Sequence, residues 1–198
     1  DECTSGFRRT FGGLHKYYKV NPDMAIFGKA LGNGYAINAI IGKQSIMSSS
    51  SSTFISSTFW TERVGPSAAL ETLNIMEKTK SWETITYTGK EIKKNWKNIA
   101  KSHNIKIKVQ GLDALPNFFF SSEKNIMYKT LITQEMLKKK ILASNAIYCS
   151  TAHKEKILIK YFNILNDIFY KISKVESGKK NIKEYLQSKT SISGMRNK

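Results

Sequence analysis

A single lysine, Lys29, lies between a short apolar run and a glycine-rich turn, and this setting suits covalent chemistry. The apolar run is Met24–Phe27, and the turn contains Gly32 and Gly34. At the mouth of a packed α/β domain, a lysine loses part of its hydration. This favours the neutral amine that forms a Schiff base. An exposed surface lysine before a loop is the alternative for this motif on its own.

A carboxylate residue, Asp1, lies before this lysine in the sequence. Asp1 is followed by Glu2 and by the run Thr4–Arg8. In proteins, a carboxylate is the usual partner of the ring nitrogen of pyridoxal phosphate, a cofactor that a Schiff-base lysine holds covalently. The carboxylate keeps that nitrogen protonated, so that the ring accepts the electrons left when a substrate Cα–H bond breaks. Asp1 and Lys29 together therefore predict a pyridoxal-phosphate site.

Several blocks in one order carry a family resemblance: Asp1–Arg8, Pro22–Met24 and Gly28–Gly34. Together they closely resemble the class III aminotransferases, and most of all the branch of glutamate-1-semialdehyde aminomutase-like enzymes. The resemblance is strongest over residues 1–76 and extends to about Lys174. It implies an α/β fold of fold type I: the second half of the large sheet domain, followed by a small C-terminal α+β domain.

The resemblance also implies roles for the two residues above. Lys29 would hold the cofactor and then move a proton between the substrate carbon and the cofactor. Asp1 would pair with the ring nitrogen. The family furthermore implies a homodimer with shared active sites and a small amino or oxo compound as substrate.

A further segment, Ser56–Pro66, resembles the phosphate-binding turn of the family. In that turn a threonine reaches the cofactor phosphate of the neighbouring subunit, assisted by the positive start of the following helix. The segment departs from the usual family pattern. Counting back from Pro66 favours Thr61, which we prefer, whereas matching Ser-Thr-Phe favours Thr58.

Two reactions fit the resemblance. An aminomutase moves an amino group within one substrate such as glutamate-1-semialdehyde, whereas an ω-amino acid or amine transaminase exchanges it with a separate oxo acid. The blocks Asp1–Arg8 and Ile26–Ala36 look closest to the aminomutase branch, which we therefore favour. A non-catalytic truncated remnant or a basic interaction module is the alternative from another class.

The chain has 198 residues and starts, by the resemblance, in the middle of a domain. We therefore expect a fragment of a longer enzyme that is inactive on its own. It has no signal-peptide pattern and no apolar run of roughly 18 residues. Its two cysteines, Cys3 and Cys149, form neither a disulfide framework nor a metal-ligand cluster. We expect a cytoplasmic protein with no metal and no membrane partner.

The net charge of +17 is concentrated in the second part of the chain. Residues 1–75 carry 7 basic and 5 acidic side chains, and residues 76–198 carry 25 basic and 10 acidic ones. Base readout favours arginine, yet only four arginines occur, and the lysines form no compact patch. We interpret them as a solvated surface and expect no nucleic-acid partner.

Hydrophobic periodicity predicts the elements that position these residues. Helices are expected from Pro66, over 82–102, 127–143, 154–175 and near 182–186; strands over 24–27, 39–42, 105–109, 118–120 and 146–149; and a polar loop over 48–53. We predict three parts: residues 1–102 complete the cofactor domain, residues 103–175 form the small domain, and residues 176–198 form a tail.

Overall fold

The computed structural model describes residues 1–59 and 61–192. The chain forms two compact units, Asp1–Thr86 and Tyr87–Lys198. The division between them falls inside one long helix, α3 (Ser81–Ser102). The domain boundary expected after residue 102 stays a prediction.

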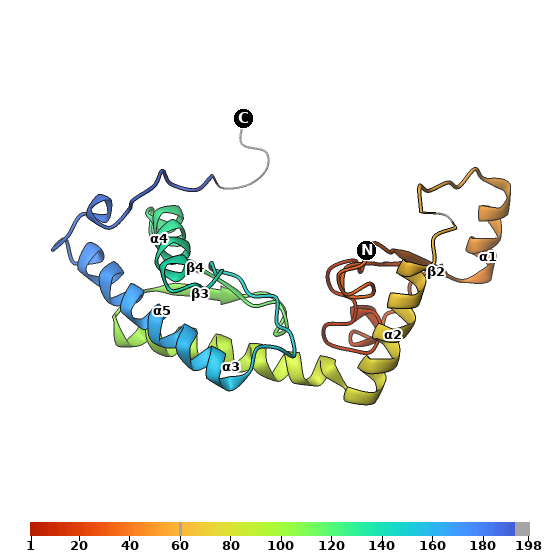
Figure 1. The fold of residues 1–198 in the computed structure, drawn as a ribbon, viewed down its shortest axis with the longest axis horizontal. Helices are drawn as coiled ribbons and strands as arrows, with labels where there is room; N and C mark the ends of the chain where they lie inside the picture. Colours follow the sequence, from red (N-terminus) through yellow and green to blue (C-terminus); the bar gives the residue numbers. More distant parts are fainter. Residues whose placement is uncertain (60, 193–198) are drawn as a thin grey trace. The chain divides into compact units, whose positions relative to one another are not determined.

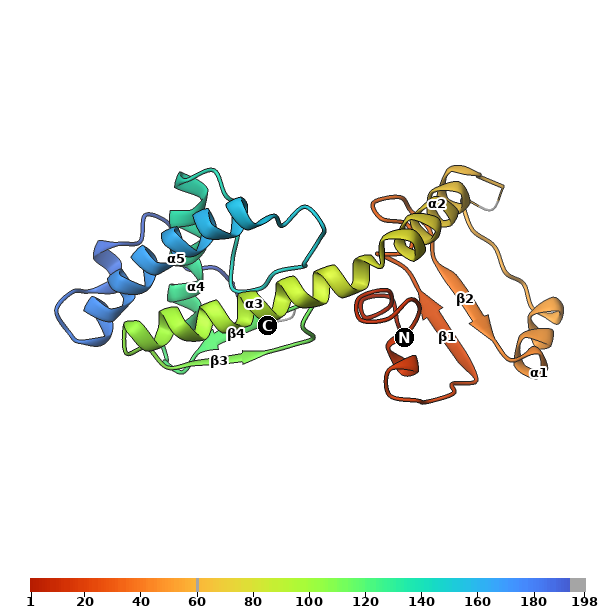
Figure 2. The ribbon, with the colours of Figure 1, turned by 90° about the horizontal axis from the view of Figure 1, so that it is seen from below.

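The first unit is built on an antiparallel pair of strands, β1 (Met24–Phe27) and β2 (Ala39–Gly42). Ile26 lies opposite Ile40 in this pair. Figures 1 and 2 both show the long helix of this unit, α2 (Val64–Thr79), beside the two strands. The full set of elements is the 3-10 turn η1 (Leu14–Lys16), β1, β2, α1 (Gln44–Met47), the 3-10 turn η2 (Ser48–Ser52) and α2 (Val64–Thr79).

An apolar cluster holds the N-terminal turn, β1 and α2 together. Phe27 on β1 packs on Phe7, with ring centroids 5.3 Å apart. Ala69 and Met76 of α2 belong to the same cluster. They lie two turns apart on one face of the helix, which is the face that packs on the core. The buried members are Phe7, Ala25, Phe27, Leu31, Ala69 and Met76. This cluster fixes the end of β1, where Lys29 follows.

The serine-rich segment is helical, so the expected polar loop is wrong in conformation although its residues are mostly exposed. Most of its hydroxyl groups bond back to the chain: Ser48 donates to the carbonyl of Gln44, and Ser51 donates to that of Ser48. Short hydroxyl side chains bond to nearby backbone carbonyls in this way and compete with the regular helical pattern, which fits a run of short helical turns.

The second unit combines a two-stranded antiparallel sheet with helices. Its elements are the greater part of α3, β3 (Ile107–Gln110), β4 (Asn117–Phe120), α4 (Asn125–Lys138), α5 (Glu155–Glu176) and the 3-10 turn η3 (Ile182–Glu184). Both views show α3 running alongside the strands (Figures 1 and 2).

Aromatic packing forms the core of this second unit. The fully buried Trp96 of α3 meets Phe118 of β4, with ring centroids 4.7 Å apart. The indole N–H of Trp96 donates to the hydroxyl of Tyr161 at 2.9 Å, so the large ring is buried without leaving its polar atom unsatisfied. Phe119 is exposed, whereas Phe118 and Phe120 on either side of it are buried, as the alternation of side chains along a strand requires.

The strand expected at 146–149 is reduced to one isolated bridge between Ala146 and Asn117. The amide of Ile147 donates to the carbonyl of Pro116, but a proline has no N–H to return the bond. On the other side of the bridge, the side-chain amide of Asn145, rather than a backbone amide, donates to the carbonyl of Phe118 at 2.8 Å. A regular ladder therefore cannot develop.

Helix α4 ends at Lys138, five residues before the expected 143. Lys140 takes a left-handed conformation with φ +60°, and the amide of Ile141 closes on the carbonyl of Met136 at 3.0 Å. Glycine usually occupies such a position. Lysine is a good helix former, so the sequence carried no stop signal here.

Glu135 of α4 gives this unit a specific acid sensitivity. Burial opposes its ionisation, but hydrogen bonds from Lys138, Lys171 and Gln134 outweigh that and lower the pKa of Glu135 from 4.5 to about 2. A depressed folded-state pKa adds stability that is fully present above pH 4.5 and is lost as pH falls toward 2.

We expect Glu135→Gln to lower the free energy of unfolding by about 1–2 kcal/mol at pH 7, because its lysine partners are partly exposed. The loss should shrink toward pH 2, measured by urea unfolding at both pH values. Glu184→Gln, which removes the exposed ion pair with Lys180, is the matched control and should change little. An equal loss for Glu135→Gln at both pH values would contradict the assignment.

Candidate active site at the end of strand β1

Lys29 is the second residue after β1 and has an exposed side chain. Its backbone is left-handed, with φ +43°, and the amides of Leu31 and Asn33 close the turn on the carbonyls of Gly28 and Lys29 at 3.0 Å each. The Nζ atom donates to the hydroxyl oxygen of Thr4. The turn thus directs the amine of Lys29 toward the N-terminal segment.

The segment that begins with Asp1 runs alongside β1 in the same direction. The amide of Glu2 donates to the carbonyl of Ile26 at 2.8 Å, and two residues later Thr4 meets Lys29. The Asp1 carboxylate accepts from the amide of Cys3 at 2.8 Å and is exposed. The structure therefore brings the segments of Asp1 and Lys29 side by side.

Two glycines allow close packing around the end of β1. A Cβ atom on Gly28 would lie 2.2 Å from the Oδ1 atom of Asn38 and 3.4 Å from the sulfur of Cys3. A Cβ atom on Gly6 would lie 2.7 Å from the ring of Phe27. A side chain at Gly6 would push the N-terminal segment away from β1, whereas one at Gly28 would collide with Asn38.

Glu2 organises the turn between Asp1 and η1. Its carboxylate accepts from the Ser5 hydroxyl and from the amide of His15 at 3.0 Å, and the Nδ1 atom of His15 lies 3.3 Å from it. Burial opposes ionisation of this carboxyl group, but the hydrogen bonds from Ser5 and His15 outweigh it, so the pKa of Glu2 is lowered. Glu2 is an anchor that sequence reasoning missed.

Thr58 and Thr61 are both exposed in the segment before α2, and Trp60 between them lies outside the described residues. Within residues 1–59 and 61–192, no hydrogen bond joins either threonine to Lys29 or Asp1. The structure therefore does not distinguish between them. A role across a subunit boundary, as the resemblance implies, requires a second copy of the chain.

The start of α2 is already occupied by a carboxylate. Glu62 accepts from the amide of Val64 at 2.5 Å and from that of Gly65 at 3.1 Å. Pro66 has no N–H, and the amide of Ser67 donates to the carbonyl of Arg63. The helix start expected to assist a phosphate group is thus satisfied by Glu62, an acid that neutralises the positive end of the helix.

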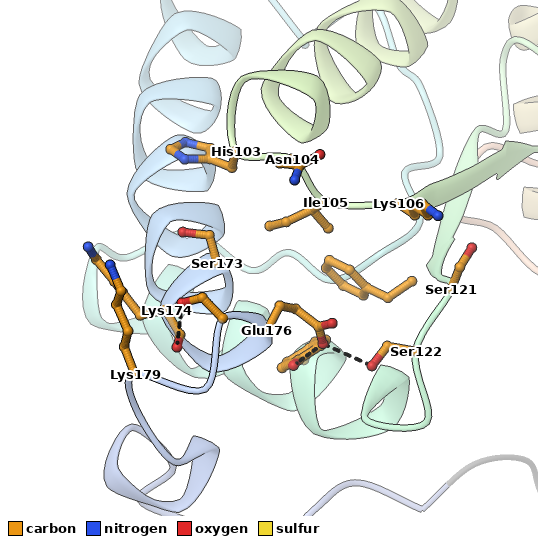
Figure 3. Close-up of a pocket in the computed structure, with 13 residues that line it drawn as sticks. His103, Asn104, Ile105, Lys106, Ser121, Ser122, Ser173, Lys174, Glu176 and Lys179 are labelled. Atoms are coloured by element: carbon orange, nitrogen blue, oxygen red, sulfur yellow. Dashed lines mark hydrogen bonds between the residues drawn. The ribbon is translucent and has the colours of Figure 1, made fainter.

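A cavity of about 570 Å³ lies in the second unit, and none of the predicted site residues lines it. In Figure 3, Glu176 of α5 points toward Ser122, and its carboxylate accepts from the hydroxyls of Ser122, at 2.9 Å, and of Tyr128. Burial first, and then Glu176, raises the pKa of Tyr128. These bonds tie α4 to α5, so we interpret this cluster as part of the packing of that unit.

The observed site is more exposed to solvent than the site expected from the sequence. The side chains of Lys29 and Asp1 are exposed, so residues 1–59 and 61–192 do not supply the desolvation that the sequence suggested for Lys29. Two contacts were also missed. Nothing in the spacing of Thr4 signalled its bond to Lys29, whereas an acid just before a helix is a recognisable capping signal for Glu62.

In the part of the chain that the structure describes, no helix combines the length and apolar character needed to cross a membrane.

The family model described as aminotransferase class-III matches residues 1–162. Among curated proteins, the chain is 27% identical to 3-aminobutyryl-CoA aminotransferase of Cloacimonas acidaminovorans, over 94% of this chain and 44% of that protein. It is 28% identical to glutamate-1-semialdehyde 2,1-aminomutase of Thermodesulfovibrio yellowstonii, over 87% of this chain and 44% of that enzyme. The chain thus spans less than half the length of these relatives.

Two solved structures illustrate the fold. The FumI protein of Sphingopyxis sp. MTA144, in its PLP internal aldimine form, has a TM-score of 0.81 at 22% identity, over 89% of this chain and 43% of that one. Acetylornithine aminotransferase of Elizabethkingia anophelis has a TM-score of 0.73 at 21% identity, over 86% and 46%. At these identities the likeness establishes the fold alone, and it confirms the predicted α/β class of fold type I.

Proposed function

The chain belongs to the class III aminotransferase family, and on that premise we propose that it is part of a pyridoxal-phosphate-dependent enzyme that moves amino groups. We favour the reaction of a glutamate-1-semialdehyde 2,1-aminomutase. One observation carries the proposal: the amine of Lys29 meets the segment that begins with Asp1, at the end of β1. An amine and a carboxylate on neighbouring segments are two of the groups that bind this cofactor.

The residues present fit the cofactor. Lys29 offers an exposed amine on a turn closed by backbone hydrogen bonds, and Asp1 offers an exposed carboxylate on the neighbouring segment. Gly6 lets the two segments approach, because a Cβ atom there would lie 2.7 Å from the ring of Phe27. Lys29 would hold pyridoxal phosphate covalently, Asp1 would bind its ring nitrogen, and Thr61 or Thr58 would bind its phosphate by hydroxyl donation.

When bound, pyridoxal phosphate supplies an electron sink for the bond that breaks at the substrate carbon. The Asp1 carboxylate would hold a proton on the ring nitrogen by its negative charge. The Nζ atom of Lys29 would accept and return a proton at the substrate carbon. Both tasks need residues whose backbone stays in place. The hydrogen bond from the amide of Glu2 to the carbonyl of Ile26 holds the segment of Asp1 against β1.

Mutase and transaminase reactions are separated by their need for an acceptor. We expect the complete protein to form 5-aminolevulinate from glutamate-1-semialdehyde alone, with no added oxo acid. A transaminase must release its first product before the second substrate enters. Turnover only in the presence of pyruvate or 2-oxoglutarate would overturn the mutase proposal.

The transaminase remains the second candidate because a specific likeness supports it. The match to 3-aminobutyryl-CoA aminotransferase extends over 94% of the chain, further than the 87% match to the aminomutase of Thermodesulfovibrio yellowstonii. The family in either case makes a small amino or oxo compound the substrate.

We further propose that the complete protein is a homodimer, located in the cytoplasm. The exposed positions of Thr58 and Thr61 fit a role at a partner's cofactor, and a chain with only two cysteines fits a reducing compartment. A two-fold interface would then place two active sites at the subunit boundary.

Sedimentation of the complete protein at assay concentration should show a dimer, and activity should fall on dilution below its dissociation constant. A fully active dilute monomer would refute the shared site.

Thr61→Val should weaken cofactor retention more than Thr58→Val if our preferred alignment is right.

A further inference from the structure

The hydroxyl of Thr4 accepts a hydrogen bond from the Nζ atom at the tip of the Lys29 side chain. From this contact and its surroundings, we infer that Thr4 is a positioning residue for the amine of Lys29 and that Glu2 is the anchor that keeps Thr4 in place. The inference deepens the proposed function and rests on it, because it assigns a task to residues beside the amine that would hold the cofactor.

The backbone of Lys29 is fixed, whereas its side chain alone is not. The turn of Gly28 to Asn33 holds the Cα–Cβ direction by two backbone hydrogen bonds. Beyond Cβ, a lysine has a flexible four-carbon stem, and an exposed one samples many rotamers. A hydrogen bond at Nζ is therefore the contact that restricts where the amine lies. The hydroxyl of Thr4 makes that contact from the neighbouring segment.

A hydroxyl suits this task better than a carboxylate. It accepts a hydrogen bond from the amine without taking a proton from it at neutral pH, since it is a very weak base. A carboxylate in the same place would hold the amine as a charged ion pair and oppose its nucleophilic form. Thr4 can thus direct the amine and leave its proton available for transfer.

Glu2 holds the segment of Thr4 from three sides. Its amide donates to the carbonyl of Ile26, its carbonyl accepts from Gly6 at 2.8 Å, and its carboxylate accepts from Ser5 and His15. The Glu2 side chain is only 12% exposed. Removal of the charged acceptor would release Ser5 and the amide of His15, and with them the turn that presents Thr4.

The first test measures the order of the Lys29 side chain in the chain itself. We would record ¹³C relaxation of the lysine Cε groups and compare Lys29 with Lys78, an exposed lysine of α2. Lys29 should be the more ordered of the two. Thr4→Val, which keeps the shape and removes the hydroxyl, should erase more than about half of that difference, and Thr4→Ser should retain it.

The second test asks whether Glu2 acts through Thr4. Glu2→Gln should also lower the order of Lys29, and the double variant should be no more mobile than the more affected single variant. Additive effects would show that Glu2 acts by another route and overturn its role as anchor. Asp23→Asn, which removes an exposed partner of Lys43, is the control and should leave Lys29 unchanged.

Thermal unfolding of each variant accompanies these measurements. If Glu2→Gln fails to fold, the pair Thr4→Val and Thr4→Ser still decides the role of Thr4. In the complete, cofactor-loaded protein we expect Thr4→Val to lower kcat about five-fold, with KM little changed and with recovery in Thr4→Ser.

The two proposals fail in different ways. Borohydride reduction and peptide mapping of the complete protein should label Lys29; a label on another lysine would refute the proposed function whatever the relaxation data show. Unchanged order of Lys29 in Thr4→Val, together with a label on Lys29, would refute the inference alone.

Discussion

Lys29→Ala should abolish turnover of the complete protein, with a loss of at least about four orders of magnitude. The methyl side chain of alanine can neither bind the cofactor covalently nor move a proton at the substrate carbon. The fold should persist, because Lys29 is exposed and lies outside the apolar cluster of the first unit. Assays of product formation and of cofactor retained after gel filtration would measure both effects.

The matched control is Lys43→Ala, which removes another exposed lysine of the same unit, paired with Asp23. It should bind the cofactor normally. Circular dichroism of both variants would verify that the fold is kept. Retained covalent cofactor in Lys29→Ala, seen as a borohydride-stable label on another lysine, would show that Lys29 is not the attachment point.

Asp1→Asn should leave the cofactor bound yet slow proton abstraction by about two to four orders of magnitude. The amide oxygen of asparagine can still accept from the amide of Cys3, so the local turn should survive. The neutral side chain no longer stabilises a protonated ring nitrogen. Exchange of the substrate α-hydrogen for deuterium would measure this step directly.

Asp23→Asn serves as the control for a lost carboxylate in the same unit, since Asp23 pairs only at the surface with Lys43. Its exchange rate should equal that of the unchanged protein. Near-normal exchange in Asp1→Asn would mean that another group serves the ring nitrogen, and the role assigned to Asp1 would then be wrong.

Local patterns sufficed where one element depends on its own residues. The apolar run before Lys29 predicted β1, and the alternation before Gln110 predicted β3 to within two residues. The long helices α3 and α5 agree with their predicted ranges within one residue at each end, because their apolar residues recur at helical spacing over many turns. The order of the blocks around Asp1 and Lys29 likewise sufficed to predict the family, which the match over residues 1–162 confirms.

Features that depend on a partner from elsewhere in the chain escaped prediction. Pro116 prevents a ladder with residues 146–149 only because the two segments meet, and Gly89 must lack a side chain because a Cβ atom would lie 1.5 Å from the carbonyl oxygen of Asp113. The end of α4 at Lys138 is set by a turn that closes on Met136 rather than by a residue type that stops helices.

The sequence by itself determined the family, the fold class and the two residues proposed for chemistry, because residue types in order carry that information. Only the tertiary structure decided how these residues are held. It placed the hydroxyl of Thr4 on the amine of Lys29 and surrounded the half-buried Glu2 carboxylate with hydrogen-bond donors. It also set Glu62 on the start of α2. Such contacts join atoms whose separation depends on how the chain folds back on itself, and no spacing in the sequence records it.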